Sequence, residues 1–327
     1  MSLYDVVTLG ETMIRLTPPT LQRIEQTTTF DIHIGGSESN TAVGLARLGM
    51  RVCWLSRLTD NSLGRAISGT MAHYGVDIAH VVWTEQDRIG LYFYEPGVAP
   101  RSSRVVYDRA HSAMSRMSAD EIPSSLFESQ TAKLLHLTGI TLAIGAADAA
   151  ARALQLARAA GWRVSFDVNH RRKLWDADSA RVGCEAFMQA ANIIFIALED
   201  AKTLYNTSAD PAEALNMLTG RYPQADIIMT LGAQGAMART SDGSLLTQAT
   251  FPAGEVGRLG GGDAFAAGVL YAILNQGADS MAQALRWGAA CAALKYSIPG
   301  DLPLFEFKEA EALVNQDQEI SKISLLR

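Results

Sequence analysis

Three consecutive glycines precede an aspartate in the C-terminal third of the chain, in the stretch GRLGGGDAFAAG at residues 257–268. Glycine loses more chain entropy on folding than other residues, so such a run indicates that something approaches the backbone closely. If a helix begins here, its first amides and its dipole would favour an anion, and Asp263 could accept a proton from an attacking hydroxyl. Transfer of a phosphoryl group needs both features. The alternative is that Asp263 only caps the helix, and this stretch alone leaves both interpretations open.

Two arginines stand where strands are expected to end. Arg109 follows the β-prone run VVYD, and Arg171 follows the run SFDVN closely. A guanidinium at such a position could hold a carboxylate or a phosphate through paired hydrogen bonds, although ordinary surface salt bridges use the same residue type. Tyr92, Tyr94 and Tyr107 on neighbouring runs could present hydroxyl groups to a polyol, or could serve only to pack strands.

A second pair of glycines precedes a helical pattern in HIGGSESNTAVGLARLG, residues 33–49. Gly35 and Gly36 would again let a ligand come close, and Asn40 in the first turn could bond to hydroxyl groups. The alternative is a plain turn in which Ser37 or Ser39 caps the helix.

The composition excludes several classes of protein. The chain has 327 residues, of which 48% are hydrophobic and 19% charged, and its net charge is −6. It can therefore build a large core, but it has no basic surface for nucleic acid. Three cysteines, far apart and without a CxxC pair, fit a cytoplasmic protein. We expect no signal peptide and no membrane span, and the six histidines lack metal-site spacing.

The elements that must position these residues are short apolar runs separated by helical patterns. Wholly apolar strands that alternate with helices predict an α/β fold, a doubly wound and mainly parallel sheet with helices on both faces. Gly49 and Gly161 are expected to end two of the helices. The predicted strands are 5–10, 51–56, 133–139, 163–169, 192–198 and 226–232.

One region breaks this alternation. Residues 89–108 contain two β-prone runs joined by a polar loop, which predicts an antiparallel pair. With the runs MIRLTPP and FDIHIGG near the N-terminus, it could form a small separate sheet. Ligands of open α/β sheets bind at the carboxyl ends of the strands, so this sheet would be a lid. We therefore expect one domain over 1–327, with a lid from about 12–34 and 89–108 inserted into the core.

Taken together, these segments resemble the ribokinase-like (PfkB) family of carbohydrate kinases. Within that family they are most similar to 2-keto-3-deoxygluconate kinases, in LYFYE, VVYDRAHSAMSRM, DVNHRRKLW and ALKYSIPGD. The family's order is kept from end to end in TLGE, IGGSESNTAVGLARLG, RLTDNSLG, FDVNHR, MTLGAQGA and GGGDAFAAG.

The resemblance implies ATP-dependent phosphorylation of the terminal hydroxyl of an acid sugar, with Mg²⁺. It makes Asp263 the general base and the amides of Gly260, Gly261 and Gly262 the anion hole. The implied sugar-binding residues are Gly36, Asn40, Tyr92, Tyr107, Arg109 and Arg171. The implied nucleotide-binding residues are Thr230, Gly232, Gly235, Gly260 and Gly262.

Three departures from the family pattern stand out. Gly257 and Arg258 occupy places where the family usually has Asp and a small hydroxyl residue, so activation by a monovalent cation is doubtful. The family's NxxE motif appears as residues 197–200, ALED, which leaves the metal ligands and the role of Asp200 unassigned. Asp108 stands where a second aromatic residue is common.

Other functions compete with a 2-keto-3-deoxygluconate kinase. A kinase of a neutral sugar or nucleoside, such as a fructokinase or ribokinase, would share most of these motifs. A catalytically weak sugar-binding protein on the same fold is the alternative from another class. A nicotinamide-dependent oxidoreductase is disfavoured because no GxGxxG follows the first strand. The lid sheet could also pair with a second copy in a homo-oligomer.

Overall fold

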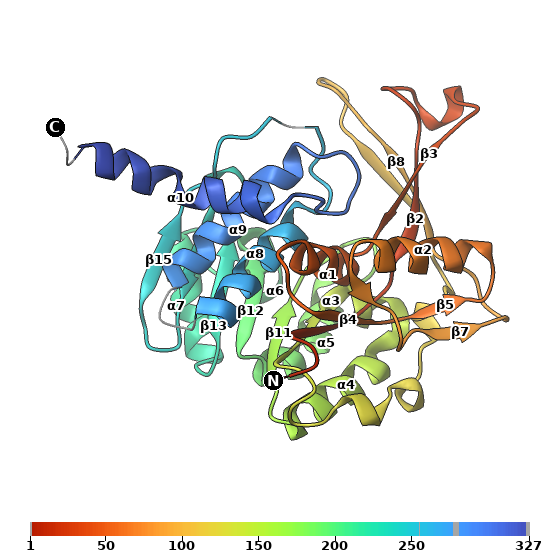
Figure 1. Cartoon of the computed structure of the whole chain (residues 1–327), viewed down its shortest axis with the longest axis horizontal. Coiled ribbons are helices and arrows are strands. Elements are labelled where there is room, and N and C mark those ends of the chain that lie inside the picture. The colour runs from red at the N-terminus through yellow and green to blue at the C-terminus, as the bar shows by residue number, and fades with distance from the viewer. Residues whose placement is uncertain (1, 255, 277–280, 325–327) are drawn as a thin grey trace.

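A nine-stranded sheet forms the centre of the protein in the computed structural model, which describes residues 2–254, 256–276 and 281–324 (Figure 1). Its strands are β1 (Val6–Leu9), β4 (Val52–Leu55), β6 (Val76–Asp77), β10 (Leu134–Thr138), β11 (Arg163–Asp167), β12 (Ile193–Ala197), β13 (Asp226–Thr230), β14 (Ala236–Arg239) and β15 (Leu245–Gln248). The order is β15-β14-β13-β12-β11-β10-β1-β4-β6, and all neighbours from β6 to β13 are parallel. The antiparallel extension by β14 and β15 is not among the predicted strands.

The six apolar runs predicted as strands are confirmed as β1, β4, β10, β11, β12 and β13. In β12, Ile194 and Ile196 belong to one hydrophobic cluster, whereas Ile193 and Phe195 belong to the other. Side chains of a strand alternate between the two faces, so a wholly apolar strand requires a sheet that is covered on both sides. The predicted doubly wound α/β fold is therefore confirmed.

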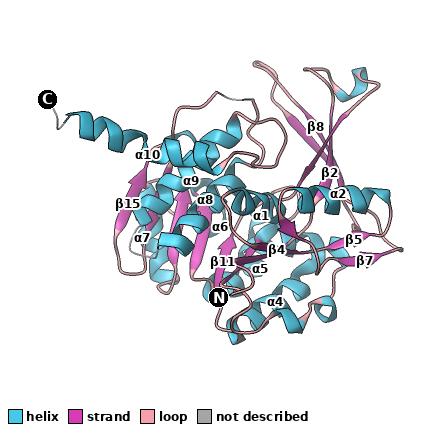
Figure 2. Cartoon of the chain, viewed as in Figure 1, coloured by secondary structure: helices cyan, strands magenta, loops and turns pink. Residues whose placement is uncertain are grey.

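Helices cover both faces of the sheet (Figure 2). One face packs against α1 (Ser37–Arg47), α2 (Ser62–His73), α8 (Gly261–Gln276) and α9 (Met281–Tyr296), and α10 (Phe307–Ser324) packs against α9. The other face packs against α4 (Ala147–Ala159), α5 (Ala177–Ala190), α6 (Leu198–Tyr205) and α7 (Pro211–Arg221), and the single turn α3 (Gly139–Thr141) precedes α4. Gly49 and Gly161 have φ angles of +87° and +77° just beyond α1 and α4, so the predicted helix ends are confirmed.

A smaller four-stranded sheet rises from the core beside α2 (Figure 1). Its order is β3-β2-β8-β9, formed by β2 (Met13–Thr17), β3 (Asp31–Gly35), β8 (Leu91–Glu95) and β9 (Arg104–Asp108). The β8–β9 and β2–β3 pairs are antiparallel, whereas β2 and β8 are parallel. The predicted strand pair within 89–108 is thus confirmed. The strands β5 (Arg57–Thr59) and β7 (Val82–Thr84) form a separate two-stranded ribbon, which is not among the predicted elements.

The strand order reverses direction between β1 and β10. From β1 the chain builds outward through β4 to β6, and it then returns to β10 and builds the other way through β13. At such a switch point, the segments after adjacent strands diverge to opposite faces and leave a crevice at the carboxyl edge. The smaller sheet begins directly after β1, so it stands over this crevice.

The stretch Gly139–Ala159 is long and apolar enough to cross a membrane by length and composition alone. Within the described structure, however, its α4 portion packs small side chains such as Ala149, Ala150 and Ala153 into the core against the sheet. The same apolar composition is expected of a helix that covers a parallel sheet.

Candidate active site

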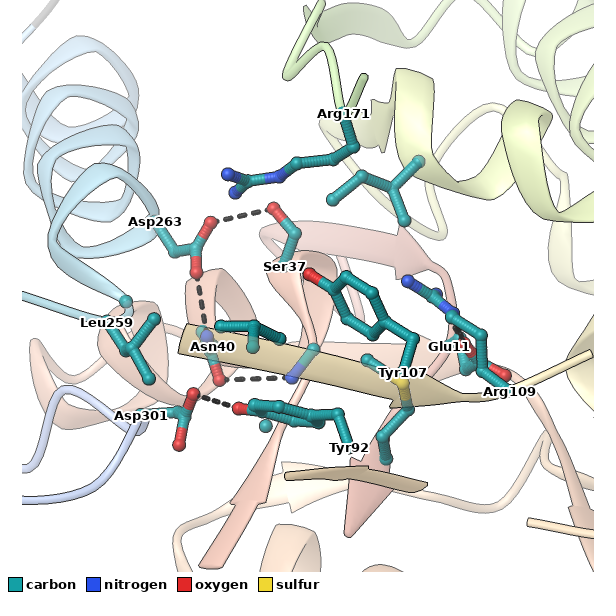
Figure 3. A pocket seen from close by; sticks show the side chains of 16 residues that line it. Glu11, Ser37, Asn40, Tyr92, Tyr107, Arg109, Arg171, Leu259, Asp263 and Asp301 are labelled. Atoms are coloured by element: carbon teal, nitrogen blue, oxygen red, sulfur yellow. Dashed lines mark hydrogen bonds and ion pairs between the residues drawn. The ribbon is translucent and has the colours of Figure 1, made fainter. Parts of the chain in front are cut away.

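A cavity of about 170 Å³ lies between the smaller sheet and the carboxyl edge of the central sheet. We call it the first cavity. Figure 3 shows how Asp263, Arg171, Tyr107 and Arg109 are arranged around it. The structure brings together here all six residues predicted for the sugar side, Gly36, Asn40, Tyr92, Tyr107, Arg109 and Arg171, along with Gly260 and Asp263.

Asp263 is the third residue of α8, and its side chain is directed away from its own helix towards α1. Its two carboxylate oxygens accept hydrogen bonds from the Ser37 hydroxyl and the Asn40 amide, both at 2.7 Å. Burial raises the pKa of Asp263 above its ordinary value, and the two hydrogen bonds oppose this rise. Capping alone therefore does not describe this residue, because its bonded partners come from α1, more than 200 residues away.

The start of α1 is held by the same interactions. The capping position is Gly36, without a side-chain cap, so the alternative in which Ser37 or Ser39 caps the helix is wrong. Asn40 accepts a bond from the Gly36 amide at 3.3 Å while it donates to Asp263. A side chain on Gly36 would overlap the carbonyl of Glu11, so its close approach is to the chain itself.

Arg109 is not a surface residue. Its Nε donates to Glu11 Oε2 at 2.9 Å, its Nη2 pairs with the same oxygen, and the Ser112 hydroxyl donates to the other carboxylate oxygen. The Arg109 and Glu11 side chains are 9% and 3% exposed. The interpretation of Arg109 as an ordinary surface salt bridge is therefore wrong, and its charge is largely balanced by Glu11.

Arg171 also lines the cavity but differs from Arg109 because it is exposed. In the described part of the chain its guanidinium forms no hydrogen bond or ion pair. It does act electrostatically on Asp263 and Asp167, lowering the pKa of each carboxyl against the effect of burial. A surface salt bridge is therefore not its role in this structure.

The tyrosines of the smaller sheet were predicted either to present hydroxyl groups to a ligand or only to pack strands, and they differ in this respect. Tyr92 is buried, and its hydroxyl donates to Asp301, which also pairs with Arg15 at 2.7 Å. Tyr107 lines the cavity with its ring 5.5 Å from the Arg109 guanidinium carbon. Tyr94 does not line it and donates instead to Ser103, the residue just before β9.

A second cavity, of about 260 Å³, lies on the other side of the N-terminus of α8. It contains Thr230, Gly232 and Gly235, which the resemblance assigns to the nucleotide, together with Gly262. Much of its remaining wall is apolar or small, from Phe251, Phe265, Ala289, Ala292, Ala293 and Tyr296. A flat, apolar ring with a polar phosphate tail is the kind of ligand that suits such a lining.

A third cavity, of about 380 Å³, joins the first two. It shares Arg171 and Asp263 with the first cavity, and Thr230 and Gly262 with the second. Two carboxylates, Asp167 and Asp200, also line it. Burial raises the pKa of Asp167 to about 8 and raises that of Asp200, so negative charge here is poorly compensated by the protein itself. Arg258 lines the same cavity.

The three glycines before Asp263 have different surroundings. Gly260 has a φ of +79°, and a side chain there would overlap the carbonyl of Asp301. A side chain on Gly261 would overlap the Tyr296 ring. At Gly262, by contrast, an added Cβ would meet nothing within 4 Å. Two of these glycines are therefore required by packing, and only Gly262 leaves space for a ligand.

A doubly wound core, a second sheet over its carboxyl edge and a helix N-terminus between joined cavities define a phosphotransferase with a ribokinase-like fold. Residues 4–303 match the pfkB family of carbohydrate kinases, and the chain belongs to that family. A 2-dehydro-3-deoxygalactonokinase of Haloferax volcanii is 35% identical over 95% of this chain and 96% of its own. A 2-dehydro-3-deoxygluconokinase of Thermoproteus tenax is 32% identical over 92% of this chain and 90% of its own. The structure of a 2-dehydro-3-deoxygluconokinase from Thermotoga maritima superposes with a TM-score of 0.87 at 31% identity, covering 95% of this chain and 98% of the other.

Sequence reasoning missed several acidic residues of the site. Asp167 is the last residue of β11, and Glu11 follows the end of β1 closely. Their position at the carboxyl edge of the sheet could therefore have revealed them. Asp301 lies in a turn after α9, and no local pattern points to its contact with the smaller sheet.

Proposed function

We propose that this carbohydrate kinase transfers the γ-phosphoryl group of ATP to the terminal hydroxyl of a 2-keto-3-deoxy sugar acid. The observation that carries the proposal is the position of Asp263, a buried carboxylate beside a helix N-terminus where the three cavities meet. The sugar would occupy the first cavity and the nucleotide the second, so that the transferred group passes through the third.

Asp263 acts as the general base in this proposal. Ser37 and Asn40 hold its carboxylate in one orientation, and its raised pKa makes it a better proton acceptor than an exposed aspartate. The proton of the sugar hydroxyl moves to a carboxylate oxygen as the hydroxyl oxygen attacks phosphorus and the bond to ADP breaks. The amides at residues 260–262 and the α8 dipole stabilise the negative charge on the phosphoryl oxygens.

The third cavity fits a hard divalent cation. Two of its carboxylates, Asp167 and Asp200, are half-buried and only partly compensated, and Mg²⁺ in kinases is commonly held by one or two carboxylates with phosphate oxygens. When bound, Mg²⁺ would neutralise charge on the phosphates. Asp200 is also fixed by a hydrogen bond from the His170 amide at 3.1 Å.

The acidic end of the sugar is assigned to Arg171. The first cavity holds several charged groups, but Arg109 is paired with Glu11, and Asp301 is paired with Arg15. The Arg171 guanidinium therefore remains available for a ligand carboxylate. The relatives whose names specify a 2-dehydro-3-deoxygluconate or 2-dehydro-3-deoxygalactonate kinase support this choice, because both compounds are sugar acids.

The smaller sheet serves as a lid in the same proposal. Tyr92 and Tyr107 on β8 and β9 form one wall of the first cavity, so movement of this sheet would open or close it. Closure would exclude water and limit hydrolysis of ATP. A single domain, pairing of two such sheets in a homo-oligomer and a cytosolic location stay predictions from the sequence.

A panel of acceptors tests the proposal. ADP formation is measured with 2-keto-3-deoxygluconate, 2-keto-3-deoxygalactonate, 5-keto-2-deoxygluconate, fructose, ribose and adenosine under identical conditions. We expect the two 2-keto-3-deoxy acids to have the highest kcat/KM. Preference for fructose, ribose or adenosine would replace the acid-sugar proposal by the neutral-substrate alternative. No sugar-dependent ADP formation with any acceptor would favour a catalytically weak sugar-binding protein.

A further inference from the structure

Lys295 is a buried charge to which the proposed reaction assigns no role. It lies in the last turn of α9 and is fully buried. Its Nζ donates to the backbone carbonyls of Ile298 at 2.9 Å and Gly300 at 3.0 Å. Asp301 is the carboxylate that acts on it most strongly, but Asp301 is already ion-paired with Arg15 and hydrogen-bonded to Tyr92. Burial lowers the pKa of the ammonium to about 8.

Helix capping explains only part of this arrangement. A cation in the last turn of a helix can satisfy free carbonyls and interact favourably with the dipole. Such a lysine usually does this from the surface, where its ammonium stays hydrated. At this buried position a methionine of similar length would fill the space without the cost of removing a charge from water. Capping of α9 therefore does not by itself account for a buried ammonium at this position.

The turn that Lys295 holds supports the anion-binding segment. Its ammonium bonds the carbonyls of residues 298 and 300, and Asp301 follows directly with its own carbonyl against Gly260. Lys295 also approaches Gly260 itself, because a Cβ there would lie 3.3 Å from Lys295 Cε. The next residue, Tyr296, packs its ring against Gly261. Residues 295–301 thus form the wall behind residues 260 and 261.

Tyr296 also holds the segment that leads into α8. The Tyr296 carbonyl accepts hydrogen bonds from the amides of Val256 at 2.8 Å and Gly257 at 3.2 Å. Together with the contacts of Gly260 and Gly261, these bonds hold both ends of the backbone segment 256–261 in place. The positive charge of Lys295 also acts on Asp263, so its field extends into the first cavity.

We propose that Lys295 is a positioning residue of the phosphoryl-transfer site. Its ammonium holds the 297–301 turn against Gly260 and stands as a fixed cation behind the amides of residues 260–262. The inference rests on the proposed function, in which those amides receive the transferred group. Two backbone carbonyls directed at one point also form part of a site that can hold a small monovalent cation. The lysine ammonium occupies that point, so the native chain needs no dissociable cation there.

Removal of the charge is the first test. For Lys295→Met we expect kcat to fall by about 10- to 100-fold, because the anion-binding amides lose their fixed backing. The KM values for ATP and sugar should change by less than about threefold, since neither ligand touches Lys295. Lys133→Met is the control, because Lys133 pairs with Asp5 at the amino ends of β10 and β1, away from the cavities at the carboxyl ends. A Lys295→Met variant that melts like the native chain and keeps its full kcat overturns the proposal.

Rescue by small cations is the second test, and a merely structural role would not produce it. Lys295→Ala is assayed in potassium, ammonium, methylammonium or tetramethylammonium chloride at constant ionic strength. We expect the three smaller cations to restore kcat saturably by about tenfold or more, because they can bind between the freed carbonyls, and tetramethylammonium to restore none. A folded and impaired variant that no cation restores overturns the proposal.

The native chain provides a measurement that does not depend on any variant. Its kcat should stay within about twofold when potassium replaces tetramethylammonium, since its cation is covalently attached. An increase of more than threefold would show a cation requirement and overturn the proposal, even if neither variant folds. The rate of ATP hydrolysis without sugar is measured with the same replacement of tetramethylammonium by potassium. Failure of every sugar as an acceptor therefore counts against the proposed function, while the cation response still decides the role of Lys295.

Discussion

The first and second cavities, which the proposed function assigns to the sugar and the nucleotide, share the N-terminus of α8, yet they are built differently. The first cavity is lined by charged and polar side chains that already bond to one another, as in Glu11–Arg109 and Asp263–Asn40. The second is lined mainly by glycines, alanines and aromatic rings. Recognition in the first therefore depends on which charges stay unpaired, and recognition in the second depends on free space beside the backbone. Removal of a charge should damage the first, and addition of atoms should damage the second.

The largest expected effect comes from Asp263→Asn. The amide cannot accept the hydroxyl proton as a carboxylate does, so kcat should fall by about 10²- to 10⁴-fold. ATP affinity, measured by calorimetry, should change little because the nucleotide cavity does not contain Asp263. Asp178→Asn is the control, since that side chain is 91% exposed. Turnover near the native rate in folded Asp263→Asn would remove the general base from the proposal.

Arg171→Ala should have the next largest effect, confined to the sugar side. Loss of a hydrogen-bonded pair with the ligand carboxylate should raise the KM for a 2-keto-3-deoxy acid by about 10- to 100-fold. Because fructose has no carboxylate, its KM should change by less than about threefold. Arg172→Ala is the matched control, as this neighbour instead donates to Thr203. An equal change for acid and neutral sugars would contradict the assignment of Arg171.

Gly262→Ala tests the nucleotide side with a smaller effect. A methyl group there meets no protein atom within 4 Å, so the melting temperature should not fall. It should nevertheless keep a phosphate from the backbone and raise the KM for ATP by about tenfold, the loss of one hydrogen bond to a charged group. Gly261→Ala is the contrasting control, because its methyl overlaps the Tyr296 ring and should lower stability. If Gly262→Ala leaves the KM for ATP unchanged, the phosphate does not approach that residue.

Much of this architecture could be predicted from the sequence because its causes are local. Strand β12 is a wholly apolar run and β10, β11 and β13 are runs with apolar centres, and the switch point follows from the strand order once the sheet is known to be parallel. The six sugar-side residues were assigned by resemblance, and the structure brings all of them to one cavity. What each of them does there remains a proposal.

The remaining features depend on contacts between distant segments. Asp263 and Ser37 are separated by 226 positions, so no local pattern shows that one orients the other. The sequence predicted two equivalent arginines, whereas pairing with Glu11 distinguishes Arg109 from Arg171. Gly36 was assigned to ligand approach, but the atom nearest its missing side chain belongs to Glu11 of the same chain. Charge balance and close packing are tertiary properties, and a linear sequence specifies them only after folding.

Both cavities stand on one sheet, so loss of the sheet should abolish both together. His136 in β10 is fully buried, with Nδ1 3.1 Å from the Ser165 hydroxyl oxygen, and burial lowers its pKa from 6.5 to about 4. The unfolded chain therefore takes up this proton first as the pH falls. Stability is complete above about pH 6.5 and declines towards pH 4, by roughly 3 kcal/mol in total from this residue.

Urea unfolding at pH 7 and pH 5 measures this effect, with sugar and nucleotide binding followed in the same samples. His136 should lower the free energy of unfolding at pH 5 relative to pH 7, whereas the raised pKa of Asp167 acts in the opposite sense. The change in this free energy from pH 7 to pH 5 should therefore be less favourable to folding in the native chain than in His136→Gln, whose side chain does not titrate. His73→Gln, at an exposed position, should leave the dependence as it is. We expect both binding activities to disappear in one transition, since both cavities rest on one sheet and on the hydrophobic clusters that cover its two faces. If nucleotide binding survives the loss of sugar binding, the two cavities rest on separately stable parts of the molecule.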